Sequence, residues 1–181
     1  MEKIRICQSD IQFSAEKAVD LLIKNNKTVT FAESCTGGLC AKKITDVSGA
    51  SQCFECSFVT YSNAKKSKLL GVLEETLNLY GAVSFNTAFE MCKGAKKAAD
   101  SDIGIGITGI AGPGGGTPEK PVGLVFVGFC AKDIHTVFRL FVSGNRDKVR
   151  DKTSDFAIDL ICKYLSGTLK EYDCLKYEIE I

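Results

Sequence analysis

The sequence predicts a single α/β domain in which helices flank a mixed β-sheet. Two observations support this class. Short β-branched or alternating apolar runs, typical of strands, take turns with longer segments of helical periodicity, and no repeat or linker divides the 181 residues. Hydrophobic residues make up 45% of the chain, which is enough for one core. We expect one unit over residues 1–181, with its core at about 12–168 and a tail at 171–181.

The elements follow from periodicity and from turn residues. In the first half we expect a helix at 12–24 with Ser14 or Asp10 near its cap, a strand at 28–34, a helix at 37–47, a strand at 53–61 and a short helix ending near Gly71. In the second half we expect a helix at 84–99, strands at 102–110, 122–131 and 135–142, and a long helix at 145–170.

Two segments have features of their own. The strand DIGIGITGI alternates glycine and isoleucine, which predicts a central strand closely approached on its glycine face. The tail EYDCLKYEIEI alternates at its end, and three arrangements are open for it: pairing with a sheet edge, pairing with a second subunit, or no fixed contact.

Composition narrows the class of function. A net charge of +1 gives no general field for nucleic acid or an anionic membrane, and no apolar run of about 18 residues or signal peptide is present. Nine cysteines, an odd number mostly within apolar segments, favour buried thiols in a reduced cytoplasm. Cys53 and Cys56 form a CxxC without a second ligand pair, and His135 is the one histidine, on an alternating strand. Metal catalysis is therefore not expected.

Glycines within and after the strand expected at 102–110 suggest a candidate nucleotide site. Gly104, Gly106 and Gly109 match GxGxxG, but they lie within a strand rather than opening a helix, so the dinucleotide fingerprint is excluded. The following loop, GIAGPGGGT at 109–117, can offer backbone N–H groups to a phosphate, or it is a plain surface loop; the two interpretations are about equal.

The stretch AESCTGG lies between an expected strand and an expected helix. Ser34 or Thr36 is then an N-cap, or Ser34 is a nucleophile at a positive helix terminus, beside Gly37 and Gly38, whose bare backbone admits a substrate. Such a serine needs a base. Lysines in YSNAKKSK supply one, either Lys65 or Lys66, while the neighbouring Cys35 is a weaker rival nucleophile without a histidine.

Five stretches together resemble the C-terminal domain family of the competence-damage inducible protein CinA, which includes nicotinamide mononucleotide deamidases. They are AESCTGG at 32, GASQCFECSFVTYSNAKKSKLLGV at 49, GAVS at 81, GITGIAGPGGGTPEKPVG at 106 and SGNRDKVR at 143. The resemblance covers roughly residues 12–168, in order and with matching spacing. Two-domain members carry an additional N-terminal domain, so this chain resembles the stand-alone form.

The resemblance implies hydrolysis of the carboxamide of nicotinamide mononucleotide to nicotinate mononucleotide and ammonia, without metal or organic cofactor. It implies Ser34 as nucleophile and Lys66 as base, with Tyr61 and Thr108 assisting at the amide. Candidates for holding the nucleotide are Thr36, Gly37, Gly38, Asn63, Gly109, Gly112, Gly114, Gly115 and either Arg146 or Arg150. The expected partners are this small-molecule nucleotide and further copies of the chain, as a dimer or trimer, with no nucleic acid and no membrane.

One departure keeps an alternative open. The family commonly has Glu-Pro after GAVS, whereas this chain has Phe85 and Asn86, so one acidic group is missing. A catalytically weak pyridine-nucleotide-binding or regulatory module of the same family is therefore the second hypothesis. A redox or metal protein built on the cysteines is the third.

Overall fold

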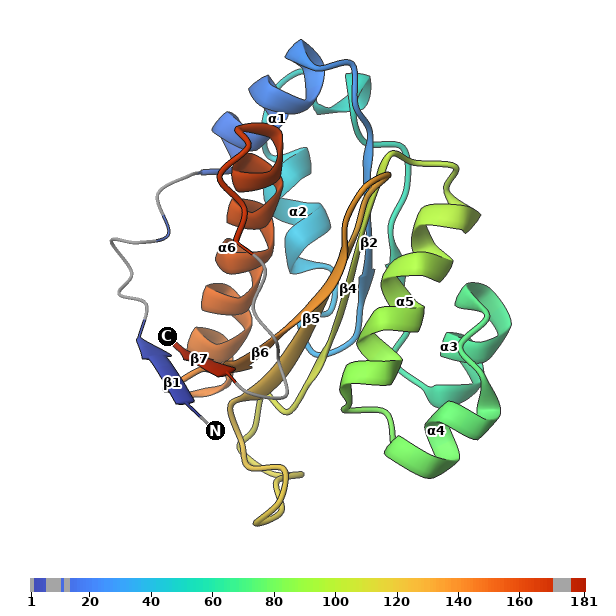
Figure 1. Ribbon diagram of the computed structural model, residues 1–181, viewed down its shortest axis with the longest axis vertical. Helices are drawn as coiled ribbons and strands as arrows, with labels where there is room; N and C mark the ends of the chain where they lie inside the picture. Colours follow the sequence, from blue (N-terminus) through green and yellow to red (C-terminus); the bar gives the residue numbers. More distant parts are fainter. Residues whose placement is uncertain (1, 6–10, 12–13, 171–176) are drawn as a thin grey trace.

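The computed structural model describes residues 2–5, 11, 14–170 and 177–181. Seven strands form one sheet in the order β1-β7-β6-β5-β4-β2-β3, and helices cover both of its faces (Figure 1). The predicted class, one α/β domain with a mixed sheet flanked by helices, is confirmed. Among the described residues, no helix is both long and apolar enough to cross a membrane.

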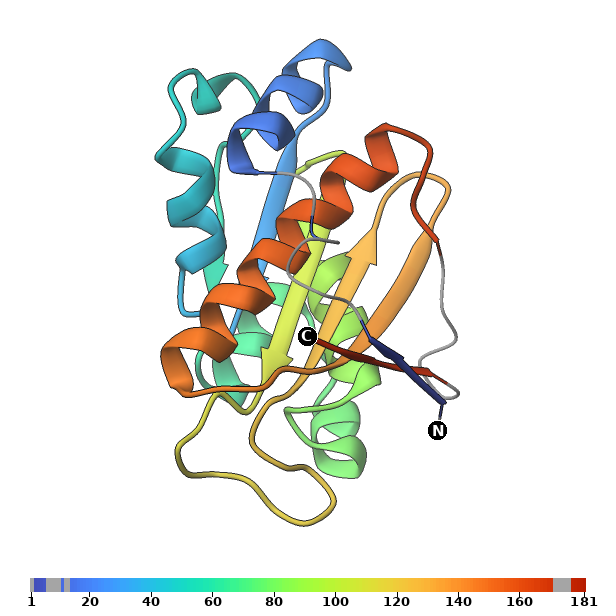
Figure 2. The same cartoon turned by 90° about the vertical axis from the view of Figure 1, so that its left-hand side faces the viewer.

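The sheet lies between two groups of helices. The strands are β1 (Glu2–Arg5), β2 (Val29–Glu33), β3 (Phe58–Val59), β4 (Ile103–Gly109), β5 (Leu124–Cys130), β6 (His135–Phe141) and β7 (Tyr177–Glu180). One face carries α1 (Ala15–Lys24), α2 (Leu39–Thr45) and α6 (Arg146–Leu165), and the other carries α3 (Asn63–Leu70), α4 (Glu74–Tyr80) and α5 (Phe85–Ala98) (Figures 1 and 2).

Strand direction determines where the site can form. Strands β2, β3 and β4 are parallel, whereas β5 and β6 form an antiparallel hairpin next to β4. The carboxyl ends of parallel strands meet at one edge of a sheet, which is where open α/β sheets bind ligands. Glu33 is in register with Val59 and Ile107, so the residues that follow, Ser34, Thr60 and Thr108, lie in one row.

The glycines of β4 and β5 let α5 lie close to the sheet. A β-carbon on Gly106 would lie 2.5 Å from the Ala88 carbonyl oxygen, and one on Gly128 only 2.4 Å from the same atom. On the opposite face, Ile103, Ile105 and Ile107 of β4 are fully buried in the main core. The prediction of a central strand approached on its glycine face is confirmed.

Several predicted boundaries were wrong. The strand expected over 53–61 is reduced to Phe58–Val59. At its expected start, the N–H groups of Cys53 and Phe54 donate to the carbonyl of Ala50, in a short 3₁₀ turn, instead of to a neighbouring strand. Helix α4 and strand β1 were not predicted. Ser14 does cap α1, its hydroxyl accepting the Lys17 N–H, whereas Asp10 lies outside the described residues.

The end of the tail pairs with a sheet edge. Strand β7 runs parallel to β6 on one side and to β1 on the other, so the first of the three arrangements is confirmed for residues 177–180. Ion pairs support both junctions: Glu180 pairs with Lys3 and Arg5, and Arg139 pairs with Glu178. The two ends of the described chain are therefore neighbours in the sheet.

Candidate active site

Ser34 lies directly beyond the carboxyl end of β2. Its backbone N–H donates to the Ile107 carbonyl at 3.0 Å, and on the other side the Thr60 N–H donates to the Glu33 carbonyl at 2.9 Å. The serine is thus held between two neighbouring parallel strands. Its side chain is half-buried, so the hydroxyl is fixed in position yet reachable.

Lys66 of α3 faces this serine. Its Nζ lies 3.1 Å from Ser34 Oγ and donates to the Thr60 carbonyl at 2.7 Å, and only 1% of the residue is exposed. Burial lowers the pKa of the Lys66 ammonium from its ordinary value of 10.5, although nearby Cys35 opposes this. Lys65 is exposed, so the structure distinguishes the two lysines that the sequence left open.

Helix α3 is well defined by its termini, which explains why Lys66 is held firmly. Ser62 caps the helix by accepting the Lys65 N–H, and Gly71 ends it in a left-handed conformation. With these ends fixed, Lys66 and Leu70 share the buried face, one turn apart.

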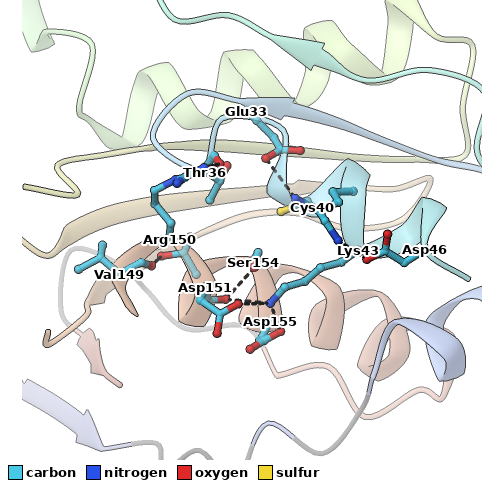
Figure 3. Close-up of polar contacts among 12 residues, drawn as sticks. Glu33, Thr36, Cys40, Lys43, Asp46, Val149, Arg150, Asp151, Ser154 and Asp155 are labelled. Atoms are coloured by element: carbon cyan, nitrogen blue, oxygen red, sulfur yellow. Dashed lines mark hydrogen bonds and ion pairs between the residues drawn. The ribbon is translucent and has the colours of Figure 1, made fainter. Parts of the chain in front are cut away.

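A buried carboxylate holds the turn after Ser34 (Figure 3). Glu33 accepts hydrogen bonds from the N–H groups of Gly38 (2.9 Å), Cys40 (3.2 Å) and Ala41 (3.0 Å) and is completely buried. It therefore satisfies the N-terminus of α2 from outside the helix. The expectation that Ser34 or Thr36 caps this helix is wrong: the N-cap position is Gly38, and the buried Thr36 hydroxyl finds no hydrogen-bond partner in the described part of the chain.

Helix α6 braces the same turn from the other side (Figure 3). Arg150 donates twice to the Thr36 carbonyl, from Nε at 3.3 Å and from Nη2 at 2.9 Å. Lys43 of α2 forms ion pairs with Asp151 and Asp155 of α6. Arg150 is thus already engaged by the protein, which argues against it as the phosphate ligand.

Arg146, one turn earlier on α6, lies between two predicted site segments. Its Nη1 donates to the Gly112 carbonyl at 2.8 Å and its Nη2 to the Tyr61 hydroxyl at 3.3 Å. Tyr61 follows β3 and is 66% exposed. Arg146 is also exposed, so it joins the glycine loop to Tyr61 while keeping a free face.

The remaining predicted catalytic residue is less accessible. Thr108 is 1% exposed, and its hydroxyl donates to the Ala82 carbonyl at 2.6 Å. It lies in the row of Ser34 and Thr60, but it also ties β4 to the GAVS segment before α5. Asn63, at the start of α3, is exposed, and its side chain has no hydrogen-bond partner among the described residues.

The glycine loop has an anchored base and an open tip. A β-carbon on Gly109 would lie 2.7 Å from the Val125 side chain, and Gly112 has a positive φ of 81° beside Val122. A β-carbon on Gly114 would meet nothing within 4 Å, and both Gly114 and Gly115 are exposed. Lys120 ties the loop to the neighbouring helices by donating to the Tyr80 and Val83 carbonyls.

Cys35 is not a competing nucleophile. It is 6% exposed, and burial raises the pKa of its thiol to about 12, so the thiolate is scarce near neutral pH. Cys53 is buried and donates to the Ala50 carbonyl, and neither it nor Cys56 is in a disulfide.

Two residues of the site were missed by sequence reasoning. Glu33 is the last residue of the buried strand β2. A glutamate at the end of a mostly apolar strand is the sequence signal that could have identified it. Thr60 contributes only its backbone carbonyl, and because every residue has one, the residue type gives no signal of this role.

Comparison with known proteins identifies the family of this chain. The family model described as the CinA C-terminal domain matches residues 11–165, so the chain belongs to that family. A competence-damage inducible protein from Thermoanaerobacter sp. (strain X514) is 54% identical over 152 residues, 84% of this chain and 37% of the relative. A CinA-like protein from Kosmotoga olearia is 50% identical over 150 residues, 83% of this chain and 36% of the relative.

Solved structures of proteins with CinA-type names have the same fold as this chain. A CinA superfamily protein from Klebsiella pneumoniae 700603 has a TM-score of 0.81 and 30% identity, covering 84% of this chain and 96% of that one. A competence/damage inducible protein from Agrobacterium tumefaciens has a TM-score of 0.76 and 38% identity, with coverages of 84% and 95%. The chain spans little more than a third of the curated relatives named above, so their whole activities do not transfer directly.

Proposed function

We propose that this protein is a nicotinamide-nucleotide amidohydrolase, which converts nicotinamide mononucleotide to nicotinate mononucleotide and ammonia. The observation that carries the proposal is the 3.1 Å distance between Lys66 Nζ and Ser34 Oγ. The lysine is buried at the carboxyl ends of the parallel strands β2, β3 and β4. A buried amine with a lowered pKa can be neutral and accept a proton, which an ordinary surface lysine does not do near neutral pH.

The proposed reaction has two halves. Lys66 takes the Ser34 proton as Oγ attacks the carboxamide carbon. The protonated Lys66 then gives that proton to the carboxamide nitrogen, the C–N bond breaks, and ammonia leaves with the acyl group bound to Ser34 as an ester. Water then attacks the Ser34 ester, with Lys66 acting as base again. The Thr60 carbonyl, which accepts from Nζ, keeps the lysine aimed at the serine through both halves.

The nucleotide end of the substrate is assigned to Arg146 and the open glycine tip. Arg146 has an exposed face beside Tyr61, and a guanidinium suits a phosphate. Gly114 and Gly115 leave backbone N–H groups uncovered nearby in the same loop. Thr36, Gly37, Gly38 and Asn63 stay candidates for substrate contact, with Gly38 the weakest because its N–H already bonds to Glu33. The setting we propose is cytoplasmic, and the homo-oligomer stays a prediction for sedimentation to test.

The test is ammonia release from nicotinamide mononucleotide by purified protein, with product identification. Ser34→Ala and Lys66→Met are expected to lower turnover by at least about 10³-fold, as for other nucleophile and base pairs, while circular dichroism stays unchanged. Lys65→Met is the matched control, because that lysine is exposed and is expected to leave turnover unaltered. Turnover that survives in Ser34→Ala would overturn the mechanism.

A second candidate function is a pyridine-nucleotide-binding module without useful catalysis. The observation that favours it is Phe85 in place of the family's usual glutamate; its ring stacks on Phe89 at 6.0 Å between centroids. Ser84 still caps α5 by accepting the Thr87 N–H, so the helix start survives this departure. Calorimetric binding of the nucleotide without ammonia release over a long incubation would select the module over the enzyme.

A further inference from the structure

Two cysteines away from the serine–lysine site face each other between α5 and β5. Cys92 of α5 is fully buried, and its Sγ lies where a β-carbon on Gly128 would be 3.0 Å away. Cys130 is two residues further along β5 and therefore on the same face of the strand. The glycines that bring α5 close to the sheet thus also bring these two thiols together.

The Cys92 S–H donates to the Phe89 carbonyl oxygen at 3.0 Å. The sulfur of Cys130, on the face of β5 that Cys92 approaches at Gly128, is an alternative acceptor for this S–H. A thiolate is the stronger acceptor, so an ionised Cys130 takes this hydrogen bond. The pair is free rather than disulfide-bonded.

Cys130 lies in the wall of a surface cavity of about 770 Å³, whereas Cys92 does not line it. Lys93, Lys96 and His135 line the same cavity, and none of them has an ion pair among the described residues. A hydrogen bond from Cys92 and then the electrostatic effect of His135, Lys96 and Lys93 lower the pKa of Cys130, against the opposing effect of burial. Burial raises the pKa of Cys92 instead. Cys130 is only 3% exposed but lines the cavity, where a small oxidant can meet its sulfur, whereas Cys92 is completely enclosed.

The other cysteines provide a contrast. Burial raises the pKa values of Cys35, Cys40, Cys53 and Cys162. Within the part of the chain that the structure describes, Cys130 differs from these four in lining the cavity and in having a thiol pKa that its neighbours lower rather than one that burial raises. These are the features of a redox-reactive thiol with a resolving partner.

We propose that Cys130 is a modification site for two-electron oxidants of the peroxide class, and that Cys92 is its resolving thiol. The Cys130 thiolate attacks one peroxide oxygen, the O–O bond breaks, and hydroxide leaves as water after protonation. The sulfenic acid so formed is attacked by the Cys92 sulfur, the S–O bond breaks, and the Cys92 proton leaves with that oxygen as water. Two thiols are oxidised to one disulfide while one hydrogen peroxide is reduced to two waters.

The crosslink would join α5 to β5 and is independent of the proposed deamidation. Neither cysteine takes part in the hydrogen bonds of Ser34 and Lys66, and the measurement is the state of the thiols rather than enzyme turnover. Failure of the deamidase proposal would leave this one standing, and the reverse also holds.

The experiment treats the reduced full chain with a small excess of hydrogen peroxide, then unfolds it in the presence of N-ethylmaleimide and weighs it. The nine cysteines should all be alkylated before treatment, and two fewer afterwards, with a proteolytic fragment pair joining Cys92 to Cys130. Cys162→Ser is the matched control, since this buried thiol is expected to leave the crosslink intact.

The single variants separate the two roles. Cys92→Ala should accumulate a dimedone-reactive sulfenic acid on Cys130, and Cys130→Ser should lose the reaction with peroxide at this site. The idea is overturned if wild-type protein keeps all its alkylation sites under peroxide, if the joined fragments contain other cysteines, or if crosslinking persists in Cys130→Ser. Circular dichroism of each variant verifies that the fold is retained.

Discussion

Gly94 of α5 lies against the end of α3: a β-carbon on Gly94 would be 1.8 Å from the Leu70 carbonyl oxygen. This contact explains why a helix interior contains a glycine, which costs about 1 kcal/mol relative to alanine when helices are exposed. It also means that the helix bearing Lys66 can lie where it does only because residue 94 has no side chain. The position of the base therefore depends on a neighbouring helix.

Gly94→Ala is expected to lower the free energy of unfolding by about 2 to 3 kcal/mol, since backbone must move to admit the methyl group. It should also reduce ammonia release, because α3 and Lys66 shift together. Gly114→Ala is the control for stability alone, because a β-carbon there would have nothing within 4 Å and the φ is ordinary. Urea denaturation measures the free energy of unfolding of both variants. Equal stability of the two would contradict the close approach of α5 to the end of α3.

Glu33→Gln is expected to destabilise the protein by about 1 to 3 kcal/mol. The amide keeps one acceptor oxygen but turns N–H donors toward the N–H groups of Gly38, Cys40 and Ala41, where the carboxylate offered two oxygens. Asp46→Asn at the exposed end of α2 should change stability by less than about 0.5 kcal/mol. Thermal and urea unfolding provide the comparison, and a neutral Glu33→Gln would remove Glu33 as the support of the turn.

Turnover is expected to rise with pH as Lys66 loses its proton, at a pH below the ordinary lysine value of 10.5. The contribution of Lys66 to stability also rises with pH. Between the lowered folded pKa and the ordinary unfolded pKa, the unfolded chain binds more protons, so this group makes unfolding harder as pH rises. At pH values below the folded pKa, the destabilisation by the buried Lys66 ammonium reaches its full value and no longer changes with pH.

Lys66→Met should remove that part of the pH dependence and raise stability near neutral pH by about 1 kcal/mol, because a buried amine is replaced by an apolar chain of similar length. Lys65→Met should leave the stability profile unchanged. Unfolding measured across pH for both variants tests this, and a profile that is the same in Lys66→Met as in the wild type would argue against a lowered pKa.

The two arginines of α6 should have different kinetic effects. Arg146→Ala is expected to raise KM for nicotinamide mononucleotide about tenfold or more, and to leave KM for nicotinamide riboside, which lacks the phosphate, nearly unchanged. Arg150→Ala should lower kcat for both substrates, because Arg150 positions the Thr36 carbonyl and the turn after Ser34. Steady-state kinetics on the two substrates distinguish them; a larger phosphate-specific effect at Arg150 would reverse the assignment.

Much of the fold could be predicted because its signals are local. Glycine and isoleucine alternate along β4 because one side meets a helix backbone and the other meets the core, and Ser62 and Ser84 mark helix starts that the structure confirms. Helix α4 was missed because only Thr76 and Leu77 are buried in its seven residues, leaving little periodicity to detect. Strand β1 pairs with β7, about 175 residues away, and local pattern contains no information on such a partner.

The site was less predictable than the fold. Residue types alone left Lys65 and Lys66 equal, and only the burial of one helix face separates them. The arginines show the same limitation: both stand in one motif, yet Arg150 is occupied by the Thr36 carbonyl while Arg146 keeps an exposed face. Backbone acceptors such as Thr60 cannot be recognised from side-chain chemistry.

The buried carboxylate of Glu33 has a consequence for inhibitor chemistry. A helix N-terminus next to a nucleophile ordinarily attracts acids, but here a full negative charge already occupies the donors of α2. Carboxylate or sulfonate groups directed at this terminus would be repelled. Neutral electrophiles that become anionic only after bonding to Ser34 Oγ, with their acidic group extended toward Arg146, fit the charge distribution better.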